Sequence, residues 1–382
     1  MVKMIKKCAA FLRREAVLCV AAVLAVISAF FVPPSAAYLS YIDWDTLALL
    51  FGLMAVMKGF QREGAFVFLG NQLLKRTVSS RQMMLVLVFL PFVCSMVITN
   101  DVSLLTFVPF GMIVLRLAHQ ERLTVPLVVL QTVAANLGSM LTPMGNPQNL
   151  YLYAQSGMGF GWFCLLMAPF VLLSGVCLGG MILLRKSAPV QPVAVETRLG
   201  SRKKLAYCTA GFILCLLGLF QVIPPVSVAV VIAVFLLISD RKVLVGIDYP
   251  LLGTFVAFFI FVGNLGALEA FKSFLASILA EHTGLTAVLA SQIISNVPAA
   301  LLLSGFTANW KGLIVGCNLG GLGTLIASMA SLISYKLMAR EYPEQRRRYL
   351  FWFTVCNVGL LAVLLLVGWG LGQAVDFWGG LF

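Results

Sequence analysis

Charged residues are scarce in this chain of 382 residues, and that scarcity excludes most soluble architectures. Asp, Glu, Lys and Arg make up 11% of the sequence and hydrophobic residues 61%, whereas soluble domains carry about a quarter charged residues and about half apolar ones. The mean hydropathy is +1.00. Since so apolar a chain cannot present an ordinary water-covered surface, the sequence predicts an integral membrane protein.

Patterns that bind transition metals are also missing. The nine cysteines form no C-x-x-C pair and mostly fall in apolar runs, where free cysteine behaves as a small hydrophobe. His119 and His282 are isolated. We therefore expect no transition-metal centre and no organic cofactor.

The net charge of +13 raises the question of a nucleic-acid partner. The basic residues, however, stand in short loops beside apolar runs, where Lys and Arg mark the cytoplasmic side of a membrane. We therefore read the charge as an orientation signal. Membrane lipid is the expected surrounding, and no nucleic acid is expected to bind.

Apolar runs long enough to cross a bilayer recur along the whole chain. We predict continuous spans at 15–32, 44–60, 160–184, 205–221, 226–239, 249–266 and 349–371, and broken spans at 123–156 and 309–336. Two further apolar segments, 82–118 and 284–307, carry a polar break in the middle. Because Arg81 precedes the first segment and Arg116 and Arg122 follow it, both of its ends belong on the cytoplasmic side. It is predicted to be a re-entrant hairpin, and 284–307 a second hairpin that enters from outside.

This topology is consistent with the charges. It puts 25 of the 27 Lys and Arg residues on one side, with a cytoplasmic amino terminus and an external carboxyl terminus. The predicted fold is an all-α membrane protein of about nine spans with an inverted repeat. Its parts are a first repeat at 1–184, a cytoplasmic, solvated linker at 185–204, an extra transmembrane helix at 205–225 and a second repeat at 226–382.

The same polar motif occurs twice inside apolar sequence. The first copy is Thr99-Asn100-Asp101 followed by Asn136-Leu-Gly-Ser-Met-Leu-Thr142-Pro143, and the second is Ser295-Asn296-Val297-Pro298 followed by Asn318-Leu-Gly-Gly-Leu-Gly-Thr324. Amides, hydroxyls and helix-breaking glycines are costly in hydrocarbon unless they line a cavity or bind a ligand. Their duplication at matching places is typical of secondary transporters.

A helix that breaks inside a membrane leaves free backbone N–H groups on one side of the break and free C=O groups on the other. The former attract anions, and the latter can hold a small cation together with hydroxyl groups. The predicted cation ligands are Thr99, Asn100, Gly138, Ser139 and Thr142 in the first half and Ser295, Asn296, Gly320, Gly323 and Thr324 in the second. The predicted substrate ligands are Thr99, Asn100, Asp101, Asn146, Ser295 and Asn296.

Asp101 is the one ionisable residue predicted near the middle of the membrane. It is either a cap that accepts backbone N–H groups at the hairpin turn or a proton carrier or cation ligand, and we favour the second role. Asp43 and Asp248, which precede two predicted spans, are expected to cap those helices.

Residues 137–150, Leu-Gly-Ser-Met-Leu-Thr-Pro-Met-Gly-Asn-Pro-Gln-Asn-Leu, resemble the broken-helix signature of the ion transporter superfamily. That group includes the divalent anion/sodium symporters, the citrate transporters and the arsenite permeases. Residues 98–110 resemble its first hairpin, and the likeness is strongest to the uncharacterised bacterial anion permeases. The resemblance implies a central substrate site, coupling to Na⁺ or H⁺, an elevator-type motion and a homodimer.

The hairpin tips depart from one branch of that group. Dicarboxylate carriers have Ser-Asn-Thr at each tip, whereas the third position here is Asp101 in one hairpin and Val297 in the other. A carboxylate beside the site repels a dicarboxylate, and an Asn-Asp tip resembles the arsenite branch. We therefore expect a cation-coupled transporter of a small anion or oxyanion, with a metalloid efflux carrier as the alternative.

Two further classes are less consistent with the sequence. An anion channel needs an open pore, whereas two closed hairpins suit alternating access. An intramembrane aspartyl protease needs two carboxylates that share one site, and Asp101 alone is predicted at that depth. We expect no enzymatic activity.

Overall fold

The computed structural model describes residues 15–191, 195 and 199–377, and this part of the chain is helical, with no β-strand beyond one isolated bridge between Ser79 and Pro189. The helices are α2 (Ala16–Ala29), α3 (Ala37–Tyr41), α4 (Trp44–Arg62), α5 (Ala65–Leu74), α6 (Ser80–Cys94), α7 (Asn100–Leu117), α8 (Thr124–Gly138), α9 (Pro147–Ser156), α10 (Phe160–Leu183), α11 (Arg202–Leu219), α12 (Pro225–Ser239), α13 (Arg241–Val245), α14 (Tyr249–Gly266), α15 (Glu269–Ile294), α16 (Asn296–Ser304), α17 (Trp310–Leu319), α18 (Met329–Glu341) and α19 (Arg346–Phe377).

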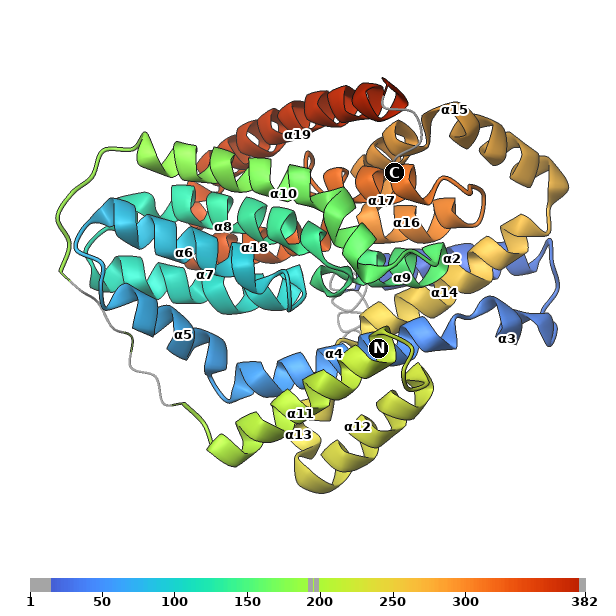
Figure 1. Ribbon diagram of the computed structural model, residues 1–382, viewed down its shortest axis with the longest axis horizontal. Coiled ribbons are helices and arrows are strands. Elements are labelled where there is room, and N and C mark those ends of the chain that lie inside the picture. The colour runs from blue at the N-terminus through green and yellow to red at the C-terminus, as the bar shows by residue number, and fades with distance from the viewer. Residues whose placement is uncertain (1–14, 192–194, 196–198, 378–382) are drawn as a thin grey trace, which may run out of the picture.

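The helices form two groups (Figure 1). A peripheral group consists of α2, α4 and α11–α14, in which α11 and α12 pack on α4 and α2 packs on α14. A central group consists of α6–α10 and α15–α19, and its middle helix is α8, which contacts α6, α7, α10, α18 and α19. The stretch Glu121–Leu141 is 89% buried within the protein. The polar residues at the end of α8 therefore lie in the protein interior.

Five helical stretches in the described part are long and apolar enough to cross a membrane: Asn100–Leu117, Glu121–Leu141, Phe160–Leu183, Tyr249–Gly266 and Pro343–Gly370. Other apolar helices, such as α2 and α12, are shorter. Together with the composition they make this an all-helical, multi-pass membrane protein. The count of nine spans and the inverted repeat stay predictions, and the basic residues before position 15 lie outside the described residues.

Local sequence explains where several helices begin. Asp43 Oδ1 accepts the backbone N–H of Thr46 at the start of α4, and Asp248 Oδ1 accepts that of Leu251 at the start of α14. Both side chains satisfy helix N–H groups that have no intrahelical partner. The prediction that both aspartates are caps is confirmed.

The segment predicted as the second hairpin follows a sharp bend. In α15 the backbone leaves helical geometry at His282, where the two parts meet at 111°. The second part of α15, residues 283–294, ends before Ser295, and α16 then runs back alongside it. We had predicted a hairpin at 284–307, but not a helix that enters it across a bend.

The described stretches of the linker at 185–204, whose residues are exposed or half-buried, also form hydrogen bonds to the protein. Ser80 N donates to Ala188 O, and Val190 N donates to Val78 O. Asn71 exchanges hydrogen bonds with the backbone of Val195, at 2.7 and 3.0 Å. Backbone hydrogen bonds to α5 and to the start of α6 therefore fix its path.

Candidate functional site

The first polar cluster joins the tip of α6–α7 to the end of α8 and the start of α18. Asn100 Nδ2 donates to Asn136 Oδ1 at 3.0 Å, and Asn136 Nδ2 donates to Ser331 Oγ at 3.2 Å. Ser328 Oγ also donates to Asn136 Oδ1, at 3.2 Å. All four side chains are buried. One amide thus connects three segments that are far apart in the sequence.

The second cluster lies where α8 is interrupted before α9. Pro147 stands at the first position of α9, where a proline needs no N–H partner, and Asn146 caps that helix by accepting from Asn149 N at 3.1 Å. Asn146 Nδ2 donates to Ser139 Oγ at 3.1 Å. Asn318, from the end of α17, donates to Asn149 Oδ1 at 2.7 Å. The break in one half therefore contacts the break in the other.

These contacts form one continuous network. Ser139 Oγ donates to the carbonyl of Asn136 at 2.8 Å, so the Asn136 cluster and the Asn146 cluster are linked. Hydrogen bonds consequently run from Asn100 through Asn136 and Ser139 to the Asn149–Asn318 pair. Amide and hydroxyl groups in a low-dielectric interior hold one another in defined orientations when they are satisfied. The predicted residues Asn100, Ser139 and Asn146 are thus brought together.

The tip of the second hairpin packs into the second break. Asn296 N donates to Ala327 O at 3.0 Å, and Ser295 Oγ lies 3.5 Å from the same carbonyl. Ser295 has φ +76°, a conformation that non-glycine residues seldom adopt and that is found at functional turns. The neighbouring Ser328 donates to Asn136 Oδ1, which also accepts from Asn100, so the two hairpin tips are linked through Asn136 and the segment Ala327–Ser328.

Gln292 fixes the loop that forms the second break. Its Nε2 donates to Gly320 O and Leu322 O, both at 2.9 Å, and its Oε1 accepts from Thr324 N at 2.9 Å. Gly323 in this loop has φ +103°, which excludes most side chains. The predicted ligands Gly320, Gly323 and Thr324 therefore stand beside the hairpin end, although the Thr324 side chain is exposed.

The remaining predicted residues surround the first hairpin. A Cβ on Gly138 would clash with the carbonyl oxygen of Phe92, so the two helices approach at a position where only glycine fits. Thr142 Oγ1 donates to Met96 O. Thr99 occupies the cap position of α7, but its side chain makes no capping hydrogen bond.

Asp101 lies half-buried in the first turn of α7. Among the described residues its carboxylate accepts no hydrogen bond, and its Oδ1 atom is buried without a partner. The backbone N–H of Asp101 is taken by Asn100 Oδ1 at 3.0 Å. The contacts expected of a hairpin cap are therefore absent from this carboxylate, which leaves a buried acceptor oxygen beside the network.

Several residues of the network were not predicted as ligands. Asn136 and Asn318 were recognised as repeated motif residues, while Ser328, Ser331 and Gln292 were missed. One signal was available: Asn136 and Asn149 are thirteen positions apart, and so are Asn318 and Ser331. Hydrogen bonds connect these residues crosswise, Asn136 to Ser331 and Asn318 to Asn149.

No group of three or more His, Cys, Asp or Glu residues within the described ranges could hold a metal ion. The polar centre is therefore built from neutral amides, hydroxyls and backbone groups, with one carboxylate beside it. Such donors suit a small hard cation or an oxygen-rich anion.

Comparison with known proteins agrees with this architecture. Residues 1–309 match the citrate transporter family. The chain belongs to that family. The resemblance to the ion transporter superfamily is confirmed, and the family is one of transporters and not of enzymes.

Two relatives cover most of the chain, and a third covers about a third of it. Inner membrane protein YbiR of Escherichia coli is 31% identical over 351 residues, which span 89% of this chain and 91% of that protein. The uncharacterized transporter MJ0456 of Methanocaldococcus jannaschii is 32% identical over 298 residues, with 78% and 81% covered. The silicon efflux transporter LSI3 of Oryza sativa is 33% identical over 144 residues, 37% of this chain and 29% of that protein.

Proposed function

We propose that this protein is a cation-coupled secondary transporter of a small anion or oxyanion, located in a bacterial inner membrane with its amino terminus in the cytoplasm. The observation that carries the proposal is the crosswise network, in which Asn136 binds Ser331 and Asn318 binds Asn149. The interrupted helices of both halves contribute to one buried polar centre. Carriers use such discontinuous helices to coordinate substrate and coupling ion.

The proposed ligands are the residues around this centre. Asn100, Asn146, Ser295 and Asn296 bring amide and hydroxyl groups to the buried segments between the helices. Asp101 adds a carboxylate oxygen without a protein partner. In this proposal, that oxygen takes up the coupling cation or proton, because an isolated buried carboxylate is costly unless it is neutralised.

The two helix groups suit an elevator-type motion, in which the central group moves against the peripheral one. Helix α4 makes a polar contact with the central group near each end. Gln155 Nε2 donates to Asp43 Oδ2 at 2.8 Å, and Gln61 Nε2 donates to Thr106 Oγ1 at 3.0 Å. Between the start of α4, the end of α9 and the turn after α11 lies a groove of about 730 Å³. In this proposal, the hydrogen bonds Gln155–Asp43 and Gln61–Thr106 break and form again when the central helix group moves against the peripheral one.

A metalloid efflux carrier is the second candidate. Asp101 favours it, since a fixed carboxylate near the site disfavours a dianionic substrate. The similarity to a silicon efflux transporter over 144 residues is in line with a small oxyacid as substrate. Both candidates share the same centre and differ in the charge of the solute.

The test is flux into and out of proteoliposomes that contain the purified protein, with imposed Na⁺ or H⁺ gradients and a panel of di- and tricarboxylates, arsenite and silicic acid. We expect one solute to accumulate only when a gradient is imposed. Asp101→Asn is expected to abolish the dependence on one cation, with Glu121→Gln, which changes an exposed carboxylate outside the polar network, as the control. Flux that ignores both gradients for every solute contradicts the proposal.

A further inference from the structure

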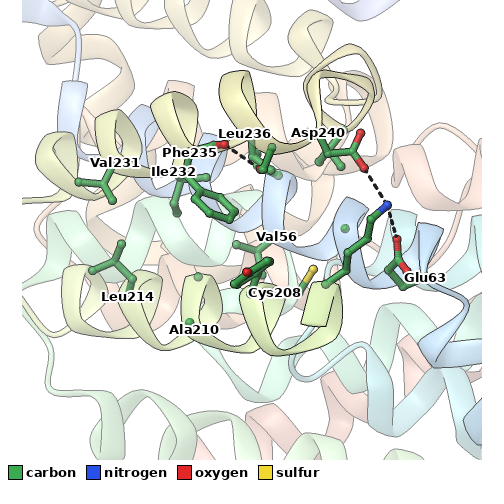
Figure 2. A pocket seen from close by; sticks show the side chains of 17 residues that line it. Val56, Glu63, Cys208, Ala210, Leu214, Val231, Ile232, Phe235, Leu236 and Asp240 are labelled. Carbon is green, nitrogen blue, oxygen red and sulfur yellow. Dashed lines mark hydrogen bonds and ion pairs between the residues drawn. The ribbon is translucent and has the colours of Figure 1, made fainter. Parts of the chain in front are cut away.

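A groove of about 420 Å³ lies within the peripheral group, between α4, α11 and α12. Its walls are mostly apolar, with Val56 from α4, Ala210 and Leu214 from α11, and Val231 and Phe235 from α12 (Figure 2). Its size falls within the range of small-molecule sites, roughly 300–1,000 Å³. It shares no residue with the polar network, so it is a separate site.

The polar groups of the groove gather at one end. Figure 2 shows Glu63 and Asp240 at that end, and Val231 and Leu214 at the other. Lys204 Nζ lies 3.3 Å from Glu63 Oε1 and 3.4 Å from Asp240 Oδ2, and Arg62 pairs with Asp240 at 3.0 Å. The groove is thus amphipathic along its length, as an amphipathic ligand requires.

Basic residues outnumber acidic ones at this charged end. The two acids, Glu63 and Asp240, lie where the ends of α4, α11 and α13 meet, and these ends carry six basic residues, of which Lys204 lines the groove: Arg62, Arg202, Lys203, Lys204, Arg241 and Lys242. Each acid already contacts Lys204. A surplus of positive charge is therefore left on the helix ends around the groove, and basic clusters at the ends of transmembrane helices attract anionic lipid headgroups.

The occupant must also suit the surroundings of the groove. Two large apolar side chains of the groove wall, Val231 and Phe235 of α12, are exposed, so the groove opens toward hydrocarbon in a membrane. A second copy of the chain is a poorer occupant. A two-fold interface brings the same patch of both subunits together, and two surpluses of positive charge would repel each other.

We propose that this groove binds one anionic phospholipid, with an acyl chain between α11 and α12 and the phosphate beside the basic residues. Glycines bring α11 close to α4 next to the groove. A Cβ on Gly59 would lie 2.6 Å from Cys208 Sγ, and one on Gly211 would lie 3.0 Å from Val56. The acyl chain fills the space that these close contacts leave beside α12. This inference does not depend on the transported solute.

Native mass spectrometry of the purified, delipidated full chain tests the proposal, with phosphatidylglycerol and phosphatidylcholine as probes. The key variant is Ala210→Trp, which fills the groove without removing a charge. The matched control is Thr209→Trp, since Thr209 is exposed on the same helix but does not line the groove. We expect the wild type and the control to retain one phosphatidylglycerol per chain in preference to phosphatidylcholine, and Ala210→Trp to lose it.

A second variant keeps the groove open and removes charge. Arg241→Gln combined with Lys242→Gln is expected to weaken phosphatidylglycerol binding by roughly tenfold or more, since each basic residue near an anionic headgroup contributes about one decade of affinity or slightly less. Its thermal unfolding checks that it folds. Equal binding of both lipids, or undiminished binding by Ala210→Trp, overturns the proposal. If Ala210→Trp turns a dimer into a monomer at unchanged lipid content, a second copy occupies the groove.

Discussion

Asn136 is the residue on which the polar network most depends. It forms three hydrogen bonds, with Asn100 at 3.0 Å and with Ser331 and Ser328 at 3.2 Å. Asn136→Ala removes all three and leaves the buried Asn100 amide without its partner. A net contribution of about 0.5–1.5 kcal/mol per hydrogen bond gives a loss of roughly 1.5–4.5 kcal/mol in the free energy of unfolding.

Asn357 offers a control of the same residue type. It is equally buried, but Nδ2 bonds only to Phe353 O of its own helix, at 2.8 Å, and Oδ1 has no partner among the described residues. Asn357→Ala removes one hydrogen bond and also an unsatisfied oxygen, so its cost should be at most about 1 kcal/mol.

Thermal unfolding in detergent, followed by tryptophan fluorescence, compares the two variants, and gradient-driven flux is measured on the same preparations. We expect Asn136→Ala to unfold at a clearly lower temperature and to lose flux, and Asn357→Ala to resemble the wild type in both. Equal effects of the two substitutions would contradict this prediction, because they would show that hydrogen bonds between distant segments contribute no more to stability and flux than one within a helix.

Two further predictions concern the backbone and the acid stability. Gly323→Ala forces a side chain into φ +103° and against Gln292 Oε1, so the variant should lose flux. The control is Gly180→Ala, which has open space at its Cβ and should be neutral or stabilising. Equal flux from both variants argues against a second break with a fixed backbone conformation. Burial opposes ionisation of Asp240, but the hydrogen bonds and charges of Arg62 and Lys204 outweigh it and lower the pKa of that carboxyl from its ordinary 3.8. The ionised form therefore stabilises the fold above about pH 4, and this contribution is lost as the pH falls through the lowered pKa. Asp240→Asn should flatten the fall in unfolding temperature between pH 5 and pH 3, and an unchanged slope would count against it.

The sequence predicted the positions of the helix breaks because their residues are incompatible with continuous helix. Pro143 and Pro147 lack the N–H that a helix interior needs, and the structure interrupts the helix between Gly138 and Pro147. The capping roles of Asp43 and Asp248 could also be predicted from the sequence, since both residues stand directly before apolar runs. These features depend on chemistry within a few residues.

Contacts between distant segments were harder to predict. Gln292 and Ser331 lie in helices where a glutamine or serine is unremarkable, and only the fold brings them to Gly320 and Asn136. The bend at His282 could not be predicted from a proline, because α15 contains none. The hydrogen bonds of the linker to α5 and the start of α6 were not predicted, because they depend on a neighbouring surface. Tertiary hydrogen bonds leave no local pattern in a sequence.

In the proposed mechanism, the helix breaks of the two halves act as one site. Gradient-driven flux through Asn149→Ala, Asn318→Ala and the double variant tests that claim most directly, because the two amides share a hydrogen bond of 2.7 Å. Residues that act as a unit have non-additive effects. We expect each single variant to lose most of the flux and the double variant to be little worse than the more impaired single one. Losses that multiply would show that the two breaks act independently and would contradict the proposed mechanism.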